Sequence, residues 1–285
     1  MQRLTYSSFM KKLLLLVLIL LSILLGYSLA KSSFTVPGFE KDKNQETEKV
    51  KKPVLRFAVL SDSGGENDLL KKTLTQAEGK GINFVIGLGD WSSVGTQEQL
   101  SVAKQVFDDS KLEYYVTAGD HDLWASRNRG ENALSNFNQV FGSAQRLIEK
   151  NEIQIVILDN SDIYKGIPSD SWELLFESLK KDVKLRFVMA HKTPFHPDSA
   201  HIMGQDAQNV KAQAENLLAI LEEGQISAFF SGDVHFFAQF KTPKQAVKIT
   251  TIGAVASQRN FQGPRFAIVT VYDDYSWKAE DVEIR

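Results

Sequence analysis

The stretch "VLRFAVLSDSGGENDLLKKTLTQAEGKGINFVIGLGD", residues 54–90, contains two apolar runs separated by an amphipathic segment. The runs at 54–61 and 82–89 are rich in Val, Ile, Leu and Phe, a composition typical of buried strands. The segment 66–80 instead carries its apolar residues at helical spacing. A strand, a helix and a strand in this order predict an α/β fold in which helices flank a largely buried sheet.

The same alternation continues along the chain. Further strand-like runs lie at 113–119, 153–159, 184–190 and 226–232, and helix-like segments lie at 97–109, 131–141, 171–181 and 209–223. Four β-type segments then follow without a helix between them, at 237–241, 246–251, 265–271 and 277–284. The predicted fold class is therefore α/β, and the tail predicts a second, more antiparallel sheet packed against the first.

The N-terminal segment has a different character. Three basic residues, Arg3, Lys11 and Lys12, precede an uncharged apolar run from Leu13 to Ala30. This pattern fits a cleaved signal peptide, and its length also reaches the lower limit for an uncleaved membrane anchor. In either case the positive flank stays inside, so we expect an extracytoplasmic protein, secreted or anchored to the membrane. Residues 31–52 are charged and poor in apolar side chains, which predicts a flexible linker before a folded domain at 53–285.

Composition excludes several kinds of chemistry. The chain has no cysteine, which rules out disulfides, thiolate zinc sites and thiol nucleophiles. Its formal net charge of -2 gives no nucleic-acid-binding signature. Any metal must be held by histidine, carboxylate or amide groups, or by water.

Four aspartates end strand-like runs. Asp62, Asp90, Asp120 and Asp233 occupy these positions, three of them directly after a glycine, and His191 follows another run. Ligands in open α/β sheets bind outside the carboxyl ends of the strands, so all five side chains are candidates for one cleft. A turn-forming role would explain any one Gly-Asp pair but not the whole set.

A cluster of four carboxylates would repel itself strongly in a partly buried site. Two divalent cations would balance about four negative charges, and imidazoles could complete their coordination. The sequence therefore predicts a two-metal centre.

These motifs resemble those of the calcineurin-like metallophosphoesterases, including purple acid phosphatase-type and cyclic nucleotide phosphodiesterase-type members. The family pattern has an Asp-x-His, a Gly-Asp, a Gly-Asn-His-Asp/Glu, a single His and a Gly-His-x-His, each after a strand. The corresponding stretches here are Asp62-Ser63-Gly64, Gly89-Asp90, Gly119-Asp120-His121-Asp122, His191 and Gly232-Asp233-Val234-His235. The resemblance implies a four-layer α/β/β/α sandwich with mixed sheets, over about residues 54–285.

The resemblance also implies a ligand set. Asp62, Asp90 and His235 would bind a first metal, and Asp90 would bridge to a second metal held with Asp120, His191 and Asp233. Carboxylates at 120 and 233 stand where the family has Asn and His, which favours Mn²⁺, Mg²⁺ or Fe over Zn²⁺.

One position departs further from the family. Gly64 replaces a ligating histidine, and Ser93 stands where purple acid phosphatases supply a tyrosine. The first metal would then keep three protein ligands and be held less firmly.

The resemblance implies hydrolysis of phosphate mono- or diesters by attack of a metal-bound hydroxide. His121 would protonate the leaving oxygen or stabilise the charge developing there, and Asp122 would orient His121. The expected substrate is a small phosphoester. Further candidate contacts to the substrate, for which a packing or solvated role is the more common one, are Trp91, Trp124, Arg127, Arg129, His196 and His201.

Two functions stay open from the sequence. The first is an exported metal-dependent phosphatase or phosphodiesterase, whose membrane association depends on whether the N-terminal segment is cleaved. The alternative is a catalytically weak metal- or phosphate-binding protein of the same fold with an incomplete first metal site. A non-metal hydrolase is disfavoured, because the chain has no Gly-x-Ser-x-Gly motif and no cysteine.

Overall fold

The computed structural model describes residues 50–285. The predicted signal peptide or anchor, and all but the end of the predicted linker, lie outside the described residues. Within 50–285 we find no helix with both the length and the apolar character that a membrane span requires.

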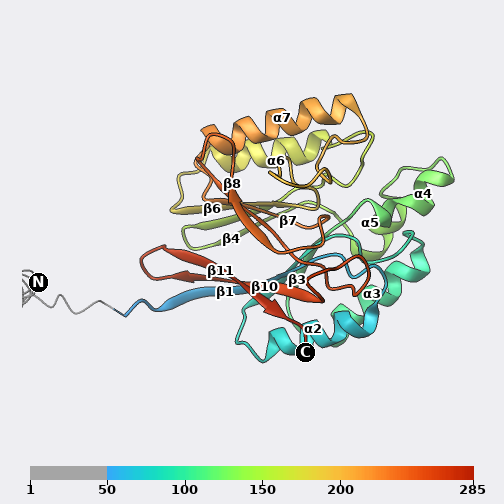
Figure 1. Ribbon diagram of the computed structural model, residues 1–285, viewed down its shortest axis with the longest axis horizontal. Coiled ribbons are helices and arrows are strands. Elements are labelled where there is room, and N and C mark those ends of the chain that lie inside the picture. Colours follow the sequence, from blue (N-terminus) through green and yellow to red (C-terminus); the bar gives the residue numbers. More distant parts are fainter. Residues whose placement is uncertain (1–49) are drawn as a thin grey trace, which may run out of the picture. The chain divides into compact units, whose positions relative to one another are not determined.

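Two mixed sheets form the centre of the fold (Figure 1). The first sheet has the order β11 (Trp277–Glu283), β10 (Arg265–Tyr272), β1 (Pro53–Leu60), β2 (Phe84–Leu88) and β3 (Tyr114–Thr117). The second has the order β4 (Arg146–Lys150), β5 (Ile153–Ile157), β6 (Leu185–Ala190), β7 (Ala228–Ser231), β9 (Lys248–Thr251) and β8 (Ala238–Lys241).

Strand directions place the carboxyl ends of the central strands together. β1, β2 and β3 are parallel to one another, and so are β5, β6, β7 and β9. The antiparallel neighbours lie toward the edges, where β10 pairs with β1 and β4 pairs with β5.

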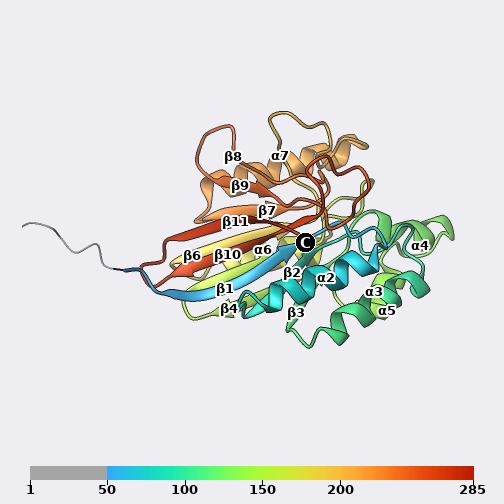
Figure 2. The same cartoon turned by 60° about the horizontal axis from the view of Figure 1, so that its bottom comes forward.

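Helices cover the outer face of each sheet. The described helices are α2 (Asn67–Glu78), α3 (Gln97–Asp109), η1 (His121–Leu123), α4 (Trp124–Asn128), α5 (Ser135–Phe141), α6 (Ser169–Leu179) and α7 (Gln208–Glu223). α2, α3 and α5 pack on the first sheet, where Figure 2 shows α2 in front of the strands, and α6 and α7 cover the second. The prediction of an α/β fold with mixed sheets flanked by helices is confirmed.

The core is divided by the sheets. Alternate residues of β1 point to opposite faces, so Phe57 and Val59 lie between the sheets while Ala58 and Leu60 face α2 and α3. Between the sheets, the rings of Phe57 and Phe187 lie 6.3 Å apart. Burial on both faces explains why these strands are continuously apolar in sequence.

The tail does not form a sheet of its own. β8 and β9 extend the second sheet beside β7, whereas β10 and β11 extend the first sheet beside β1. The prediction of a separate antiparallel tail sheet was therefore wrong, because the four tail strands are shared between the two sheets.

Candidate metal centre

The predicted ligands meet at one end of the sandwich. Asp62, Asp90 and Asp120 follow β1, β2 and β3 of the first sheet, and His191 and Asp233 follow β6 and β7 of the second. The backbone N–H of Asp233 donates to Asp62 Oδ2 at 3.1 Å, a hydrogen bond that joins the two sheets at this end.

Two glycines allow this close approach. A Cβ added to Gly119 would lie 2.0 Å from Asp90 Oδ1, and one added to Gly232 would lie 1.8 Å from Ser61 Oγ. Any larger residue would push the strand ends apart. The Gly-Asp pairs thus reflect packing between neighbouring strand ends as well as turn formation.

Four of the predicted ligands have left-handed backbone conformations. Their φ values are 57° for Asp62, 58° for Asp90, 66° for Asp233 and 63° for His235. This region costs a residue with a side chain about 1–2 kcal/mol. Such strain gathers at functional sites when the surrounding structure enforces it.

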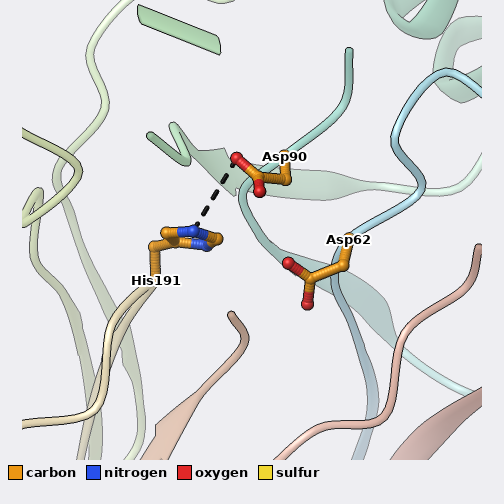
Figure 3. Close-up of side chains that lie close together, drawn as sticks. All are labelled: Asp62, Asp90 and His191. Carbon is orange, nitrogen blue, oxygen red and sulfur yellow. Dashed lines mark ion pairs between the residues drawn. The ribbon is translucent and has the colours of Figure 1, made fainter. Parts of the chain in front are cut away.

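Two clusters of possible metal ligands share His191. Among residues 50–285, ligand atoms of Asp62, Asp90 and His191 lie within 4.8 Å of one another, and so do those of Asp120, His191 and Asp233. His191 Nε2 is 3.7 Å from Asp90 Oδ1, 3.3 Å from Asp120 Oδ1 and 3.7 Å from Asp233 Oδ1. Figure 3 shows Asp62, Asp90 and His191 turned toward one another.

The donor atoms fit a metal ion. His191 Nδ1 lies 2.7 Å from the carbonyl oxygen of Leu88, which can only accept, so Nδ1 carries the proton and Nε2 is left to coordinate. Asp233 Oδ2 is buried without a hydrogen-bond partner, an arrangement that is costly unless a cation is bound. These two features support a metal ion held by Asp90, Asp120, His191 and Asp233.

Burial of charged groups dominates the electrostatics of the site, and repulsion between carboxylates adds to it. Burial, together with the charges of Asp120, Asp122 and Asp62, raises the pKa of Asp90 well above its usual range, against the opposing effect of His191. Burial lowers the pKa of His191, but Asp90, Asp120 and Asp233 outweigh it and raise the pKa overall. The site therefore favours bound cations.

Lys192 belongs to this site but was not predicted from the sequence. Its ammonium lies 2.7 Å from Asp233 Oδ1 and 3.5 Å from Asp120 Oδ1, and its side chain is 8% exposed. Burial lowers its pKa, but the carboxylates of Asp233 and Asp120 outweigh burial and raise it. Asp120 and Asp233 stand where the family has uncharged residues, and these two additional negative charges were the only sign in the sequence of a nearby cation.

The first predicted metal site is less compact than the second. His235 Nε2 lies 3.7 Å from Asp62 Oδ1 but does not join the close cluster of Asp62, Asp90 and His191. Gly64 leaves open space, since the nearest atom to an added Cβ is Ala256 Cβ at 4.0 Å. Among residues 50–285, no other histidine or carboxylate joins the close cluster of Asp62, Asp90 and His191. The histidine that the family has at position 64 is therefore not replaced there.

Two cavities border the ligands. One, of about 170 Å³, is lined by Asp62, Gly64 and Ser93, and the other, of about 340 Å³, is lined by Asp120, Lys192 and Asp233. The residues that line both are Asp90, His121, His235 and Arg259. Arg259, an exposed residue that follows no strand-end motif, was not predicted as a site residue.

His121 faces both cavities in a fixed orientation. Its Nδ1 lies 3.0 Å from the carbonyl oxygen of Ser93, so Nδ1–H is the donor and Nε2 is free. Its ring stacks on Trp124 with the centroids 4.1 Å apart. These contacts suit the proton-donating role predicted for His121.

The role predicted for Asp122 needs correction. Asp122 is fully buried and accepts hydrogen bonds from the backbone N–H groups of Gly119, Asp90, Trp91 and Ser92, each at 3.0 Å. It accepts no hydrogen bond from His121, whose orienting partner is the Ser93 carbonyl. Asp122 holds the turn that presents Asp90, so it is a positioning residue.

The other candidate contacts divide into two groups. Trp124 stacks on His121, and the exposed His201 lines the larger cavity. The remaining four have structural contacts: Trp91 is buried and donates to the Thr117 carbonyl, His196 packs on Phe236 and Phe240, Arg127 lies over the ring of Tyr164, and Arg129 pairs with Glu131.

Solved structures with the same fold include two at low sequence identity. Purple acid phosphatase PPD1 from yellow lupin (Lupinus luteus) has a TM-score of 0.57 and 12% identity, covering 80% of this chain and 51% of its own. The protein TT1561 of Thermus thermophilus has a TM-score of 0.54 and 10% identity, covering 81% of this chain and 99% of its own. This chain therefore spans about half the length of the lupin phosphatase.

Sequence comparison assigns the family. No curated protein sequence matches the chain. The family model of the calcineurin-like phosphoesterases matches residues 55–237, more than half of the chain and the part that carries all the predicted ligands. The protein belongs to the calcineurin-like phosphoesterase family.

Proposed function

We propose that this protein is an exported metal-dependent phosphoesterase that hydrolyses small phosphate mono- or diesters at a two-metal centre. Family membership supports a metal-dependent phosphoester hydrolase in general. The observation that carries the proposal is the convergence of Asp90, Asp120 and Asp233 on Nε2 of His191, within 3.3–3.7 Å.

The proposed ligand sets follow the strand ends. Asp62, Asp90 and His235 would hold one ion, and Asp90, Asp120, His191 and Asp233 would hold the other. When bound, two divalent ions would neutralise phosphoryl oxygens and activate a water molecule. Oxygen-rich coordination favours Mn²⁺, Mg²⁺ or Fe over Zn²⁺ as the native metal.

The chain's own residues complete the reaction. The attacking water releases one proton to solvent as its oxygen bonds to phosphorus and the bond from phosphorus to the leaving oxygen breaks, and protonated His121 donates its Nε2 proton to that leaving oxygen. The fixed Nδ1 contact with Ser93 keeps Nε2 facing the cavities. Arg259 lines both cavities and supplies a guanidinium that can bind a phosphoryl oxygen.

A second candidate function is a metal- or phosphate-binding protein with weak catalysis. Two observations favour it: Gly64 leaves the first site without a fourth protein ligand, and the Lys192 ammonium lies on the second-site carboxylates. Binding of metal without turnover would be the signature of this function.

The proposed function is tested by hydrolysis of nitrophenyl phosphate and bis-nitrophenyl phosphate by the compact unit of residues 51–285. We expect no activity after chelation and recovery of activity on addition of Mn²⁺, with elemental analysis following metal content. The ratio of the two rates separates a monoesterase from a diesterase. Metal binding without hydrolysis of either ester would favour the second candidate function, and full activity after chelation would exclude metal dependence.

Export of the protein is proposed from the N-terminal sequence alone. The basic residues before the apolar run from Leu13 to Ala30 support an extracytoplasmic location for the phosphoesterase domain. The test is the mass of the mature chain. A secreted protein should have a mass that lacks residues 1–30, and an anchored protein should have the full mass and be found in the membrane fraction. Recovery of the intact chain from the cytoplasm would contradict export.

A further inference from the structure

We propose that Lys192 is a built-in competitor for the second metal position, so that its ammonium must leave the carboxylates before an ion can bind there. The inference rests on the proposed function only in its assignment of the ligands. Its consequence is a second site that fills only at raised metal concentration.

The side chains of Lys192 and His191 both lie close to the same two carboxylate oxygen atoms. The ammonium of Lys192 lies 2.7 Å from Asp233 Oδ1 and 3.5 Å from Asp120 Oδ1, while His191 Nε2 lies 3.7 Å and 3.3 Å from those atoms. A metal ion coordinated by His191 and these oxygens would meet the ammonium at the same carboxylates. Two cations that close to one another repel, so each weakens the binding of the other.

Burial makes the competition strong. The side chain of Lys192 is 8% exposed, and those of Asp120 and Asp233 are 13% and 9% exposed. Water screens such a pair poorly, so the ammonium stabilises the carboxylates in the metal-free protein. Lys192 is also held at its backbone, where its N–H donates to Asn160 Oδ1 at 2.9 Å and its carbonyl accepts from Asn160 Nδ2 at 2.7 Å.

A cavity beside Lys192 can accommodate its side chain when a metal ion displaces the ammonium. Lys192 lines the larger cavity, of about 340 Å³, together with the polar side chains of Gln205 and Asp206. A flexible lysine can leave Asp233 and remain within this cavity while its backbone stays fixed. Release of the ammonium is therefore a change of side-chain rotamer and needs no rearrangement of the fold.

The test is a calorimetric titration with Mn²⁺ of the parent and of Lys192→Met, which retains the bulk but not the charge. We expect one of the two binding steps to tighten at least tenfold and the other to change less than threefold. Lys165→Met, which removes an exposed lysine, is the matched control and should change neither step. Equal affinities in the parent and Lys192→Met, or weaker binding in the variant, would overturn the inference.

A measurement on the unmodified chain guards against misfolding of the variant. Acetylation of Lys192, followed by peptide mass mapping, should be slow without metal and several-fold faster once the weaker step is saturated. An unchanged labelling rate through both steps would also overturn the inference. Neither measurement uses a substrate, so an inactive parent would contradict the proposed function without affecting this result.

Discussion

Asp90→Asn is expected to reduce phosphoester hydrolysis by about a thousandfold or more and to weaken binding of both metal ions. Asp90 is the carboxylate assigned to both ligand sets, and its side chain lines both cavities. The variant is nearly isosteric. Its side-chain oxygen can still accept the His121 backbone N–H, which lies 3.0 Å from Asp90 Oδ1, so the loop that carries it is retained.

The same substitution should stabilise the metal-free protein. Burial and neighbouring carboxylates raise the pKa of folded Asp90 above its unfolded value. As the pH rises above the pKa of the unfolded state, the unfolded protein ionises Asp90 more readily than the folded protein does, so the folded state loses stability. This loss is complete once the pH exceeds the pKa of the folded state. We therefore expect Asp90→Asn to increase the free energy of unfolding at neutral pH without metal, because the amide cannot ionise.

Denaturant unfolding with and without Mn²⁺ measures both effects. The parent should gain stability from Mn²⁺, because an ion that binds only the folded state stabilises it, and Asp90→Asn should gain much less. Asp159→Asn is the matched control: Asp159 is another buried aspartate whose pKa burial raises, but its partner is Ser161. An Asp90→Asn protein with parental activity, or with undiminished stabilisation by Mn²⁺, would show that Asp90 does not bridge the ions.

The strand-end aspartates were predictable because their signal is local. Each follows an apolar run, and parallel strands bring their carboxyl ends to one edge, so Asp62, Asp90 and Asp120 could be placed together from sequence. The steric need for Gly119 and Gly232 beside them was not visible, because it arises from contacts between different strands.

Strand pairing was less predictable than strand positions. The apolar pattern of 265–271 indicates a strand but does not say that it pairs with β1 rather than with the preceding strand, β9. β4 was missed, because its sequence "RLIEK" has one buried residue and lies at a sheet edge. Edge strands carry a weaker apolar signal than central ones.

At the site, the sequence could not predict the directions in which individual side chains point. In sequence Lys192 resembles a solvated lysine, and only the fold directs its ammonium to Asp233. The neighbours His121 and Asp122 suggested a catalytic pair, yet one turn of 3₁₀ helix sends them to opposite environments, an open cavity and a buried cage of backbone N–H groups.

His121→Asn is expected to separate proton donation from metal binding. Asparagine can keep the hydrogen bond to the Ser93 carbonyl through its amide N–H, but it has no group that replaces Nε2. For an alkyl phosphoester, whose leaving oxygen needs a proton, we expect kcat to fall by about 10²–10⁴-fold. For a nitrophenyl ester, whose leaving oxygen departs readily as an anion, the loss should be far smaller.

The paired measurement is kcat for the two esters, with metal content determined on the same samples. His201→Asn is the matched control: His201 also lines the larger cavity, but as a candidate substrate contact it should affect both esters to the same degree. An equal loss on both esters would mean that His121 does not act as the proton donor to the leaving group. Loss of bound metal in His121→Asn would instead mean that His121 helps to position Asp90, whose Oδ1 accepts a hydrogen bond from the His121 backbone N–H. The dependence on the leaving group therefore distinguishes a catalytic His121 from a structural one, because a structural defect would slow both esters alike.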